Sequence, residues 1–393
     1  MHLSHLSLKD FRNYQELDLT LGKGLFLFQG ENAQGKTNLL EAVAMLATSN
    51  SFHASSDREL VNWQASDHVT RIVAAVERHS EDLNIEIVIF DPTQQEKDSS
   101  TEREFQFITP LDRQRKRIKI NGVPKRAIDL IGQVTVVLFA PNDLSLVNGS
   151  PEERRRFLDR GLCQLQPHYC QALQKFRKIV AQRSALLKRI RENQEDPRML
   201  DFLDEKLTEL ATMITFERRR MVASLNQHVD ELQAIISGGR EHLTIVYRPS
   251  FVIEPAWNTL ETLQHYRAQL LEARRKEIRQ GVCLLGPHRD DLEFLVNGVN
   301  MLTYGSRGQQ RTVALASKLG ELEFMRTVTG EEPILLLDDV FSELDFSRRE
   351  YLLRQVLQHE QVMITATDFT SFPGEVLARA HQYRVVAGEV IRC

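Results

Sequence analysis

Residues 30–37 read GENAQGKT and match G-x-x-x-x-G-K-[S/T], the motif of a phosphate-binding loop, which strongly limits the folds open to the chain. The match lies between an expected buried strand at residues 24–30 and an expected amphipathic helix at residues 36–48, the context that the motif requires. In such a loop Lys36 reaches the β- and γ-phosphates and the Thr37 hydroxyl holds Mg²⁺. We expect a nucleoside triphosphate to be bound by the whole loop: Gly30, Glu31, Asn32, Ala33, Gln34, Gly35, Lys36 and Thr37.

Residues 333–339 read PILLLDD, an apolar run that ends in two acidic residues. Such a run is typical of a central parallel strand that delivers carboxylates to its C-terminal end. We expect Asp338 to bind Mg²⁺ together with Thr37, and Asp339 to lie beside the attacking water. With Lys36, these two acids are the expected catalytic residues. The alternative is a buried strand followed by an aspartate that caps a helix.

A third segment precedes an expected helix and contains Ser306, Gly308 and Gln309 in an S-x-G-Q pattern. It resembles the signature loop of ABC-type ATPases, which caps the γ-phosphate bound on a second subunit, so these three residues are further candidates for nucleotide binding. Residues 342–345 (SELD) resemble the D-loop of the same class. The alternative for the first segment is a helix start with Ser306 as its cap.

Composition limits the class of protein. Of the 393 residues, 42% are hydrophobic and 26% charged, as in ordinary globular chains, and the net charge is −4. The longest apolar stretch, at residues 134–141, is far shorter than the ~20 residues of a membrane helix. The four cysteines form no C-x-x-C pair or zinc-ligand spacing. A secreted, membrane or zinc-finger protein is therefore disfavoured, and we expect a cytoplasmic enzyme or molecular machine without a membrane partner.

Hydrophobic periodicity divides the chain into three zones. Residues 1–150 are rich in expected strands, with a polar tract at 91–104 that we expect to be an exposed loop. Residues 151–280 are mostly helical, because 168–193 and 199–236 lack glycine and proline; the second run has room for a break near 217–220. Strands return over residues 281–393. They are expected at 282–286, 292–298, 333–339 and 361–368, with a helical pattern between successive pairs.

Motifs spread over the whole chain resemble the RecF family, bacterial recombination mediators related to SMC-type ATPase heads. The matching segments are 11–14 (FRNY), 30–41 (GENAQGKTNLLE), 141–159 (PNDLSLVNGSPEERRRFLD), 286–294 (GPHRDDLEF), 305–315 (GSRGQQRTVAL) and 335–345 (LLLDDVFSELD). Two positions depart from the family pattern: Asn142 stands where an acid is expected, and His53 where the family often has arginine. Arg12 and Asn13 are either nucleotide contacts, as in related heads, or the tip of a charged hairpin.

The resemblance implies an α/β fold, an ABC/SMC-type P-loop ATPase head built from residues 1–150 and 281–393, with a mostly helical lobe, 151–280, inserted between them. It implies ATP as the nucleotide, an ATP-dependent homodimer, and binding to single-stranded DNA and gap junctions. It also implies a RecR-like mediator as a partner in loading the recombinase RecA during repair, replication and the SOS response. We expect slow hydrolysis, because related heads have glutamate at Asp339, and many ABC ATPases have histidine at Thr367.

Two tracts are strongly basic. Residues 111–126 contain seven Lys or Arg against one Asp, and residues 160–191 contain eight against no acid. Such tracts indicate salt-sensitive contacts to the DNA backbone, and the alternative is a solvated helix face. The candidates in the longer tract are Lys175, Arg177, Lys178, Arg183, Lys188, Arg189 and Arg191.

Two other kinds of nucleotide machine remain as alternatives. The first is another SMC-like or transporter-type ATPase subunit, but a transporter subunit would place its two ATP motifs much closer together than residues 30–37 and 333–339 are here. The second is a P-loop kinase or GTPase, which would act as a monomer and would not need the S-x-G-Q segment.

Overall fold

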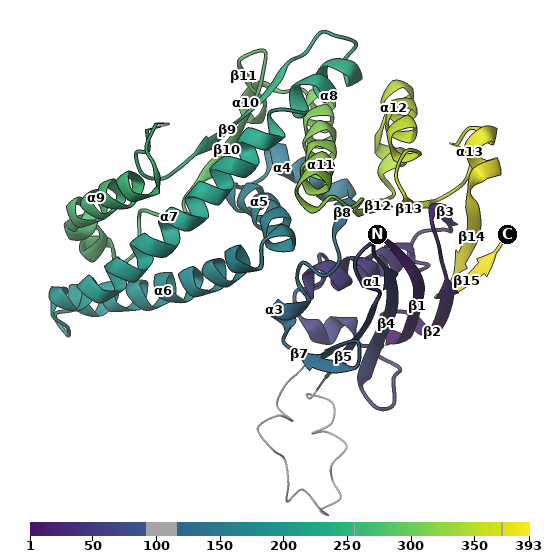
Figure 1. The fold of residues 1–393 in the computed structure, drawn as a ribbon, viewed down its shortest axis with the longest axis horizontal. Coiled ribbons are helices and arrows are strands. Elements are labelled where there is room, and N and C mark those ends of the chain that lie inside the picture. Colours follow the sequence, from purple (N-terminus) through teal and green to yellow (C-terminus); the bar gives the residue numbers. More distant parts are fainter. Residues whose placement is uncertain (92–115, 255, 371) are drawn as a thin grey trace, which may run out of the picture. The chain divides into compact units, whose positions relative to one another are not determined.

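The computed structural model describes residues 1–91, 116–254, 256–370 and 372–393 and divides the chain into two compact units (Figure 1). The first unit combines Met1–Pro141 with Met325–Cys393, and the second unit is Asn142–Phe324. Apart from Asp91, the expected loop at 91–104 lies outside the described residues, as do residues 111–115 of the first basic tract. No helix within the described ranges is long and apolar enough to span a membrane.

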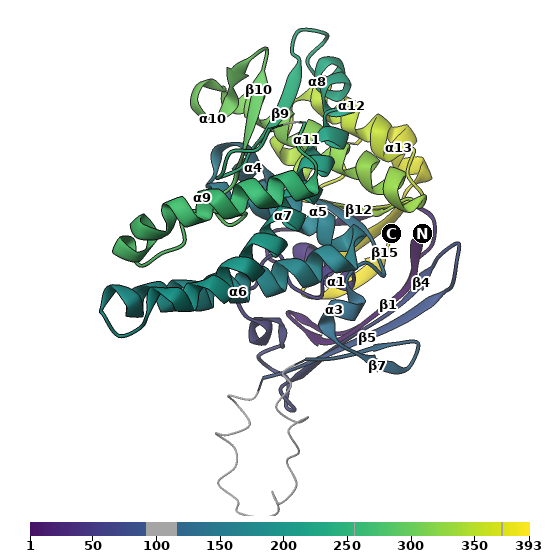
Figure 2. The ribbon, with the colours of Figure 1, turned by 60° about the vertical axis from the view of Figure 1, so that its left-hand side comes forward.

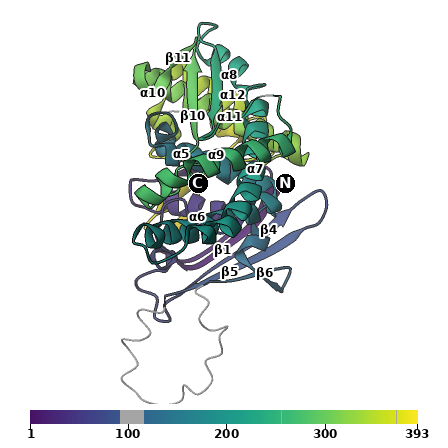
Figure 3. The same ribbon diagram turned by 90° about the vertical axis from the view of Figure 1, so that its left-hand side faces the viewer.

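The first unit contains an antiparallel sheet in the order β2-β1-β4-β5-β6-β7, of which β1, β4, β5 and β6 are labelled in Figure 3. Buried and exposed residues alternate along β4 and β5, because one face of the sheet packs on the core. Asn121 and Gly122, both with positive φ, form the turn between β6 and β7. The strands are β1 (His2–Phe11), β2 (Tyr14–Thr20), β4 (Val69–Glu77), β5 (Leu83–Phe90), β6 (Lys116–Ile120) and β7 (Val123–Lys125).

A second sheet of the same unit has the order β15-β14-β3-β13-β12-β8, and all pairs are parallel except β14 with β15. Its strands are β3 (Gly24–Gln29), β8 (Val136–Phe139), β12 (Ile334–Asp338), β13 (Gln361–Ala366), β14 (His381–Val386) and β15 (Glu389–Arg392). β12 is buried at all its positions, as the run of four apolar residues predicted. The strands before the phosphate loop and before the acidic pair are therefore separated by one strand, β13.

Helix α1 (Lys36–Thr48) joins the two sheets in one core, and its bounds are those predicted from the sequence. All its residues from Leu39 to Ala47 are buried, so the prediction of an amphipathic helix is wrong over this range, because the helix is covered on every side. The same core cluster includes Leu6 of the first sheet and Leu336 of the second. The remaining elements of this unit are η1 (Asp57–Leu60), α3 (Ala127–Leu130), η5 (Val340–Glu343), α12 (Phe346–Val356) and α13 (Gly374–Arg379); η3 (Pro141–Leu144) spans the border between the units.

The second unit is mostly helical, and α6, α7 and α9 pack against one another (Figure 2). The predicted run at 199–236 is two helices, and the break lies at residues 226–228, beyond the arginine-rich 217–220. The helices are α4 (Ser145–Asn148), α5 (Pro151–Leu165), α6 (Pro167–Arg191), η4 (Pro197–Met199), α7 (Leu200–Leu225), α8 (Val229–Ile236), α9 (Thr259–Gln280), α10 (Met301–Tyr304) and α11 (Arg307–Thr329), the last crossing into the first unit.

A small antiparallel sheet belongs to this unit and has the order β11-β10-β9. It consists of β9 (Leu243–Arg248), β10 (Asp291–Val296) and β11 (Val299–Asn300). The strand predicted at residues 282–286 is wrong, because this segment bonds to side chains instead of a neighbouring strand. The Leu284 N–H donates to Glu277 Oε1 at 2.7 Å, the Gly286 N–H donates to Ser250 Oγ at 2.7 Å, and Tyr266 Oη donates to the Leu285 carbonyl at 3.2 Å.

The border between the units differs from the expected lobe of residues 151–280, because the second unit continues to Phe324. Most of α11 packs within this unit. Lys318 Nζ lies 5.6 Å from the centre of the Phe157 ring, and a Cβ at Gly320 would approach Val229 to 2.7 Å. The S-x-G-Q segment therefore belongs to the helical unit.

Two buried charge clusters hold the helices of the second unit together. Arg183 is fully buried and pairs with Asp204 at 2.6 Å and Glu277 at 2.7 Å. Arg218, also buried, donates to Asp159 at 2.9 Å and lies 3.6 Å from Asp290. These partners come from α5, α6, α7, α9 and the segment before β10, so each cluster joins elements that are distant in the chain.

Candidate nucleotide-binding site

The phosphate loop connects β3 to α1, and two glycines allow its path. Gly35 has φ +114°, and a Cβ there would lie 2.6 Å from the side-chain nitrogen of Asn13. A Cβ at Gly30 would lie 2.4 Å from the carbonyl oxygen of Val385 in β14. The first position thus requires the conformational freedom of glycine and the second its small size.

Lys36 lies over the loop with its side chain folded back on it. Its Nζ donates to the carbonyl oxygens of Gly30 at 2.6 Å and Glu31 at 2.7 Å. Burial lowers the pKa of Lys36, and the carboxylates of Asp339 and Asp338 oppose this shift. Both carboxylates therefore act on the same ammonium group, although the acidic pair lies about 300 residues away in the sequence.

Thr37 and Asp338 meet as the two motifs predicted. The Thr37 hydroxyl lies 2.9 Å from each carboxylate oxygen of Asp338, which is buried at the end of β12. Thr365 of β13 stands opposite Asp338 in the parallel register and donates its hydroxyl to Asp338 Oδ1 at 2.8 Å. A hydroxyl beside a carboxylate is a fitting pair of oxygen ligands for Mg²⁺, which keeps water and phosphate as its other ligands. Sequence reasoning missed Thr365, because only the strand register places it there.

Asp339 follows β12 with its backbone in the left-handed region, at φ 48° and ψ 26°. Its N–H donates to Thr365 Oγ1 at 3.0 Å, and Ser342 Oγ donates to its carbonyl oxygen at 2.7 Å. Aspartate tolerates this conformation better than most residues. The turn directs the chain away from the sheet immediately after Asp338, so the two neighbouring acids have different surroundings.

The turn between β1 and β2 lies against the phosphate loop. Asn13 Nδ2 donates to the Gln34 carbonyl at 2.8 Å, and Tyr14 Oη donates to the Gly35 carbonyl at 2.9 Å. The N–H of Gly388 also donates to the Gln34 carbonyl, at 3.0 Å. Asn13 thus lies in the hairpin turn and contacts the loop, while its contact with a nucleotide stays a prediction. The FRNY motif at residues 11–14 was the sequence feature that pointed to Asn13. No sequence feature pointed to Gly388.

Arg12 in the same turn forms an ion pair with Glu41 of α1, with two nitrogen–oxygen distances of 2.8 Å, and it donates to the Glu59 carbonyl at 3.0 Å. Glu41 is completely buried in the middle of an apolar helix. A buried carboxylate needs such a partner, so Arg12 has a structural role in fixing the turn to α1.

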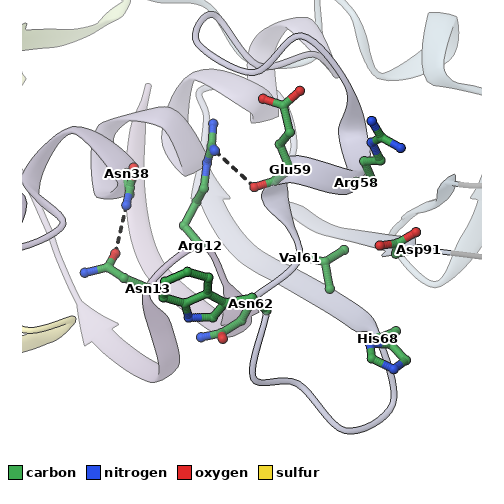
Figure 4. A pocket seen from close by; sticks show the side chains of 10 residues that line it. Arg12, Asn13, Asn38, Arg58, Glu59, Val61, Asn62, His68 and Asp91 are labelled. Carbon is green, nitrogen blue, oxygen red and sulfur yellow. Dashed lines mark hydrogen bonds between the residues drawn. The ribbon is translucent and has the colours of Figure 1, made fainter. Parts of the chain in front are cut away.

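A hollow of about 630 Å³ opens beside this turn (Figure 4). Asn38 Nδ2 donates to Asn13 Oδ1 at 2.8 Å, and both residues line the hollow. The other lining residues are Arg12, Arg58, Glu59, Val61, Asn62, Trp63, His68 and Asp91. Because Asn13 also bonds to the phosphate loop, the hollow begins one side chain away from it.

Ser306, Gly308 and Gln309 lie in the second unit, where α11 begins. Ser306 Oγ accepts the Gln309 N–H at 3.2 Å, and Gln309 Oε1 accepts the Ser306 N–H at 3.1 Å, which is a reciprocal helix cap. Gln309 Nε2 also donates to Glu241 Oε1 at 3.0 Å. The capping alternative is thus what the structure contains, while Ser306 itself stays exposed.

The basic tract of α6 separates into buried and exposed residues. Arg183 is wholly occupied by its buried partners, which excludes it from contact with DNA. The six other candidates are exposed: Lys175, Arg177, Lys178, Lys188, Arg189 and Arg191. The departures Asn142 and His53 are exposed as well.

The chain matches known proteins over nearly its whole length. A family model described as "RecF/RecN/SMC N terminal domain" matches residues 2–382. The DNA replication and repair protein RecF of Chloroflexus aurantiacus is 43% identical, and that of Halalkalibacterium halodurans 38%, each over 99% of both chains. A solved structure of the recombination mediator RecF with ATP has a TM-score of 0.86 at 30% identity and covers 100% of this chain and 97% of its own. An Smc head from Pyrococcus furiosus, at 13% identity and a TM-score of 0.53, shares the fold.

Proposed function

The chain belongs to the RecF family of DNA replication and repair proteins, and from this premise we propose that it is a slow ATPase whose bound ATP joins two copies of it on DNA. The observation that carries the proposal is the contact of Thr37 with Asp338, which unites the phosphate loop and the acidic strand. The relatives' RecF name and the solved RecF–ATP complex support ATP as the nucleotide.

Each residue of the site has a distinct task in this proposal. The loop N–H groups and Lys36 bind the β- and γ-phosphates, and the lysine exchanges the Gly30 and Glu31 carbonyls for phosphate oxygens. Thr37 and Asp338 would hold Mg²⁺, which supplies charge compensation on the phosphates. Thr365 fixes the Asp338 carboxylate through its hydroxyl, and the hollow at Asn13 and Asn38 receives the nucleoside.

Slow turnover follows from two side chains. Asp339 is one methylene shorter than the glutamate of related heads, so it holds the attacking water less well as a general base. Thr367, exposed just after β13, lacks an imidazole for the γ-phosphate. The site therefore binds ATP better than it hydrolyses it, and the binding energy serves as a switch.

The dimer is proposed from the signature segment. Ser306 uses one acceptor position for the Gln309 N–H, which leaves its own O–H free to donate. As an exposed residue at the start of a long helix, it is suited to reach a γ-phosphate held by a second copy. Hydrolysis would then release the two heads and their DNA.

Sedimentation with and without ATP tests this mechanism. We expect ATP to convert the wild type to a dimer, Ser306→Arg to bind ATP but stay monomeric, and Lys36→Met to do neither. The control Asn258→Ala removes a comparable helix cap, that of α9, and should dimerise normally. A Ser306→Arg protein that dimerises with ATP, or a wild type that hydrolyses at full rate as a monomer, would show the two-headed mechanism to be wrong.

For DNA we propose one face of α6. Lys175, Lys178 and Arg189 are three and fourteen residues apart and so lie on the same side of the helix. The opposite set includes Arg177, which pairs with Asp159 at 3.3 Å, and Arg191, which donates to the Gln280 carbonyl at 3.4 Å. On the proposed face Arg189 also has a partner, Glu195 at 3.2 Å, so the cations without an ion pair among the described residues are Lys175 and Lys178.

Two matched triple variants test the DNA face. Replacing Lys175, Lys178 and Arg189 by glutamine should weaken single-stranded DNA binding and reduce its salt slope by about 0.7 per lost phosphate contact. The same change at Arg177, Lys188 and Arg191 should have much less effect. Equal affinities and slopes for both triples and the wild type would contradict the assignment.

The proposed partners complete the function. We propose that the ATP-bound dimer recognises single-stranded and gapped DNA and helps a RecR-like mediator load the recombinase in repair and the SOS response. The RecFOR pathway named for the solved RecF structures supports this place. Co-sedimentation of the dimer with gapped DNA and the mediator, compared with fully duplex DNA, measures both contacts.

A further inference from the structure

The hollow beside the phosphate loop contains a tryptophan whose exposure has no structural explanation. Trp63 lies between η1 and β4 and is 88% exposed, although it lines the hollow. The chain has one other tryptophan, Trp257, which stacks on His265 with ring centres 3.9 Å apart. Trp63 has no such ring partner among the described residues, so the large apolar surface of an indole is left available to a ligand.

The backbone around Trp63 is fixed, even though its side chain is not covered. The neighbouring Asn62 is buried, and its N–H donates to the Asp10 carbonyl at 2.8 Å. Asn62 Oδ1 accepts the Gln64 N–H at 2.8 Å, and the Asn62 carbonyl accepts the Ala65 N–H at 3.0 Å. The indole is therefore presented from a well-anchored turn, which lowers the entropy that a ligand loses when it stacks there.

The position of the hollow indicates which part of a ligand would meet the indole. Asn13 lines the hollow and bonds to the phosphate loop at Gln34, while Asn38 lies at the start of α1. A nucleotide whose phosphates lie at residues 30–37 would thus extend its sugar and base past Asn13 into the hollow. Trp63 and His68 are the ring side chains among the residues that line it, and the indole of Trp63 offers the larger apolar face.

We propose that Trp63 stacks on the base of the bound nucleotide and makes the site prefer purine to pyrimidine nucleotides, an inference that rests on the nucleotide site proposed above. Every base has a π-face, but the two fused rings of a purine cover more of an indole than one pyrimidine ring does. The phosphate loop binds any nucleoside triphosphate, so selectivity among bases must come from the hollow.

Fluorescence tests the stacking directly, because Trp257→Phe leaves Trp63 as the sole tryptophan and keeps a ring against His265. In this variant ATP should quench the tryptophan emission, and the ATP concentration at half-maximal quenching should agree with the Kd measured by calorimetry. Tripolyphosphate, which fills the loop but has no base, should bind without quenching. Trp63→Ala should weaken ATP binding roughly tenfold, and CTP and tripolyphosphate binding less; Trp63→Phe should keep most of the affinity.

The possible outcomes separate this inference from the proposed function. If ATP binds with unchanged Trp63 emission, or if Trp63→Ala binds ATP and CTP as the wild type does, the stacking role is wrong while the nucleotide site stands. If the wild type binds neither ATP nor tripolyphosphate, the nucleotide site itself is wrong. Because Trp63 is so exposed, Trp63→Ala should unfold at the same urea concentration as the wild type, so a failure to fold will not obscure the result.

Discussion

Lys36 in the first unit and Arg218 in the second are both buried cations that lie near two carboxylates, but they differ in what neutralises them. Arg218 donates directly to Asp159, and its pKa is raised well above its usual value, because the surrounding negative groups outweigh burial. Lys36 donates to backbone carbonyls instead, and burial lowers its pKa.

The difference separates a charge that holds the fold from a charge kept for a ligand. A cation paired with carboxylates within the protein is not available to bind a ligand. Removing it leaves the buried acids without a compensating positive charge. A cation held only by carbonyl oxygens loses little when a phosphate replaces them. We therefore expect substitution of Arg218 to lower stability and substitution of Lys36 to abolish nucleotide binding.

The largest effect is expected from Arg218→Met, which leaves the buried Asp290 without its cation and leaves Asp159 with the exposed Arg177 as its remaining ion-pair partner. The free energy of unfolding should fall by about 3–5 kcal/mol in urea denaturation. Arg156→Met is the matched control: its pairs with Glu152 and Glu153 are exposed, so less than about 1 kcal/mol should be lost. Similar losses of unfolding free energy in the two variants would show that the buried pairs of Arg218 contribute no more to stability than exposed ones do.

A smaller effect is expected from pH, through His288 in the second unit. Burial lowers the pKa of His288 to about 4, below the usual 6.5, and its ring lies 5.7 Å from that of Phe176. Between these two pKa values His288 is protonated in the unfolded chain but not in the folded chain. The contribution of His288 to stability is therefore fully present above pH 6.5 and decreases as the pH falls toward 4, by roughly 3 kcal/mol.

Urea denaturation at pH 7 and pH 4.5 measures this loss. His288→Gln should flatten the pH dependence, whereas His53→Gln, at an exposed histidine, should leave it as in the wild type. The same slope in all three proteins would mean that His288 is not the group responsible.

The smallest effect on stability is expected where the effect on function is largest. Lys36→Met should change the free energy of unfolding by no more than about 1 kcal/mol, because the loss of two hydrogen bonds to carbonyls and of the attraction to Asp338 and Asp339 is offset by removing the cost of a buried charge. The same variant should show no ATP binding by calorimetry. A loss of stability as large as that of Arg218→Met would make Lys36 a structural residue and refute the comparison.

The sequence predicted the local features well and the distant partners poorly. The bounds of α1 follow from the loop motif and the hydrophobic period, and β12 from its apolar run. Residues 282–286 looked equally apolar, but side chains of Glu277 and Ser250 satisfy their backbone instead of a strand. Thr365 had no signal at all, since its contact with Asp338 depends on the register of β13 against β12.

The charge clusters show the same limit. Arg183 was indistinguishable from its basic neighbours on α6, because a shift of one residue along a helix can move a side chain from solvent into the core. Only the packing of α6 against α7 and α9 reveals that its partners are Asp204 and Glu277. Composition and spacing identify which charged residues could contact DNA, and only the fold shows which of them are exposed.

The position of β3 between β13 and β14 has a consequence for the order in which the protein is made. During synthesis β3 and its phosphate loop leave the ribosome long before both neighbouring strands, which belong to Gln361–Val386. Until then the sheet edge that carries the loop has no partner, and such unpaired strands are prone to aggregate. A nascent chain stalled before residue 361 therefore contains the complete loop sequence but lacks the two strands that flank β3, so ATP can stabilise only molecules in which these strands have been made.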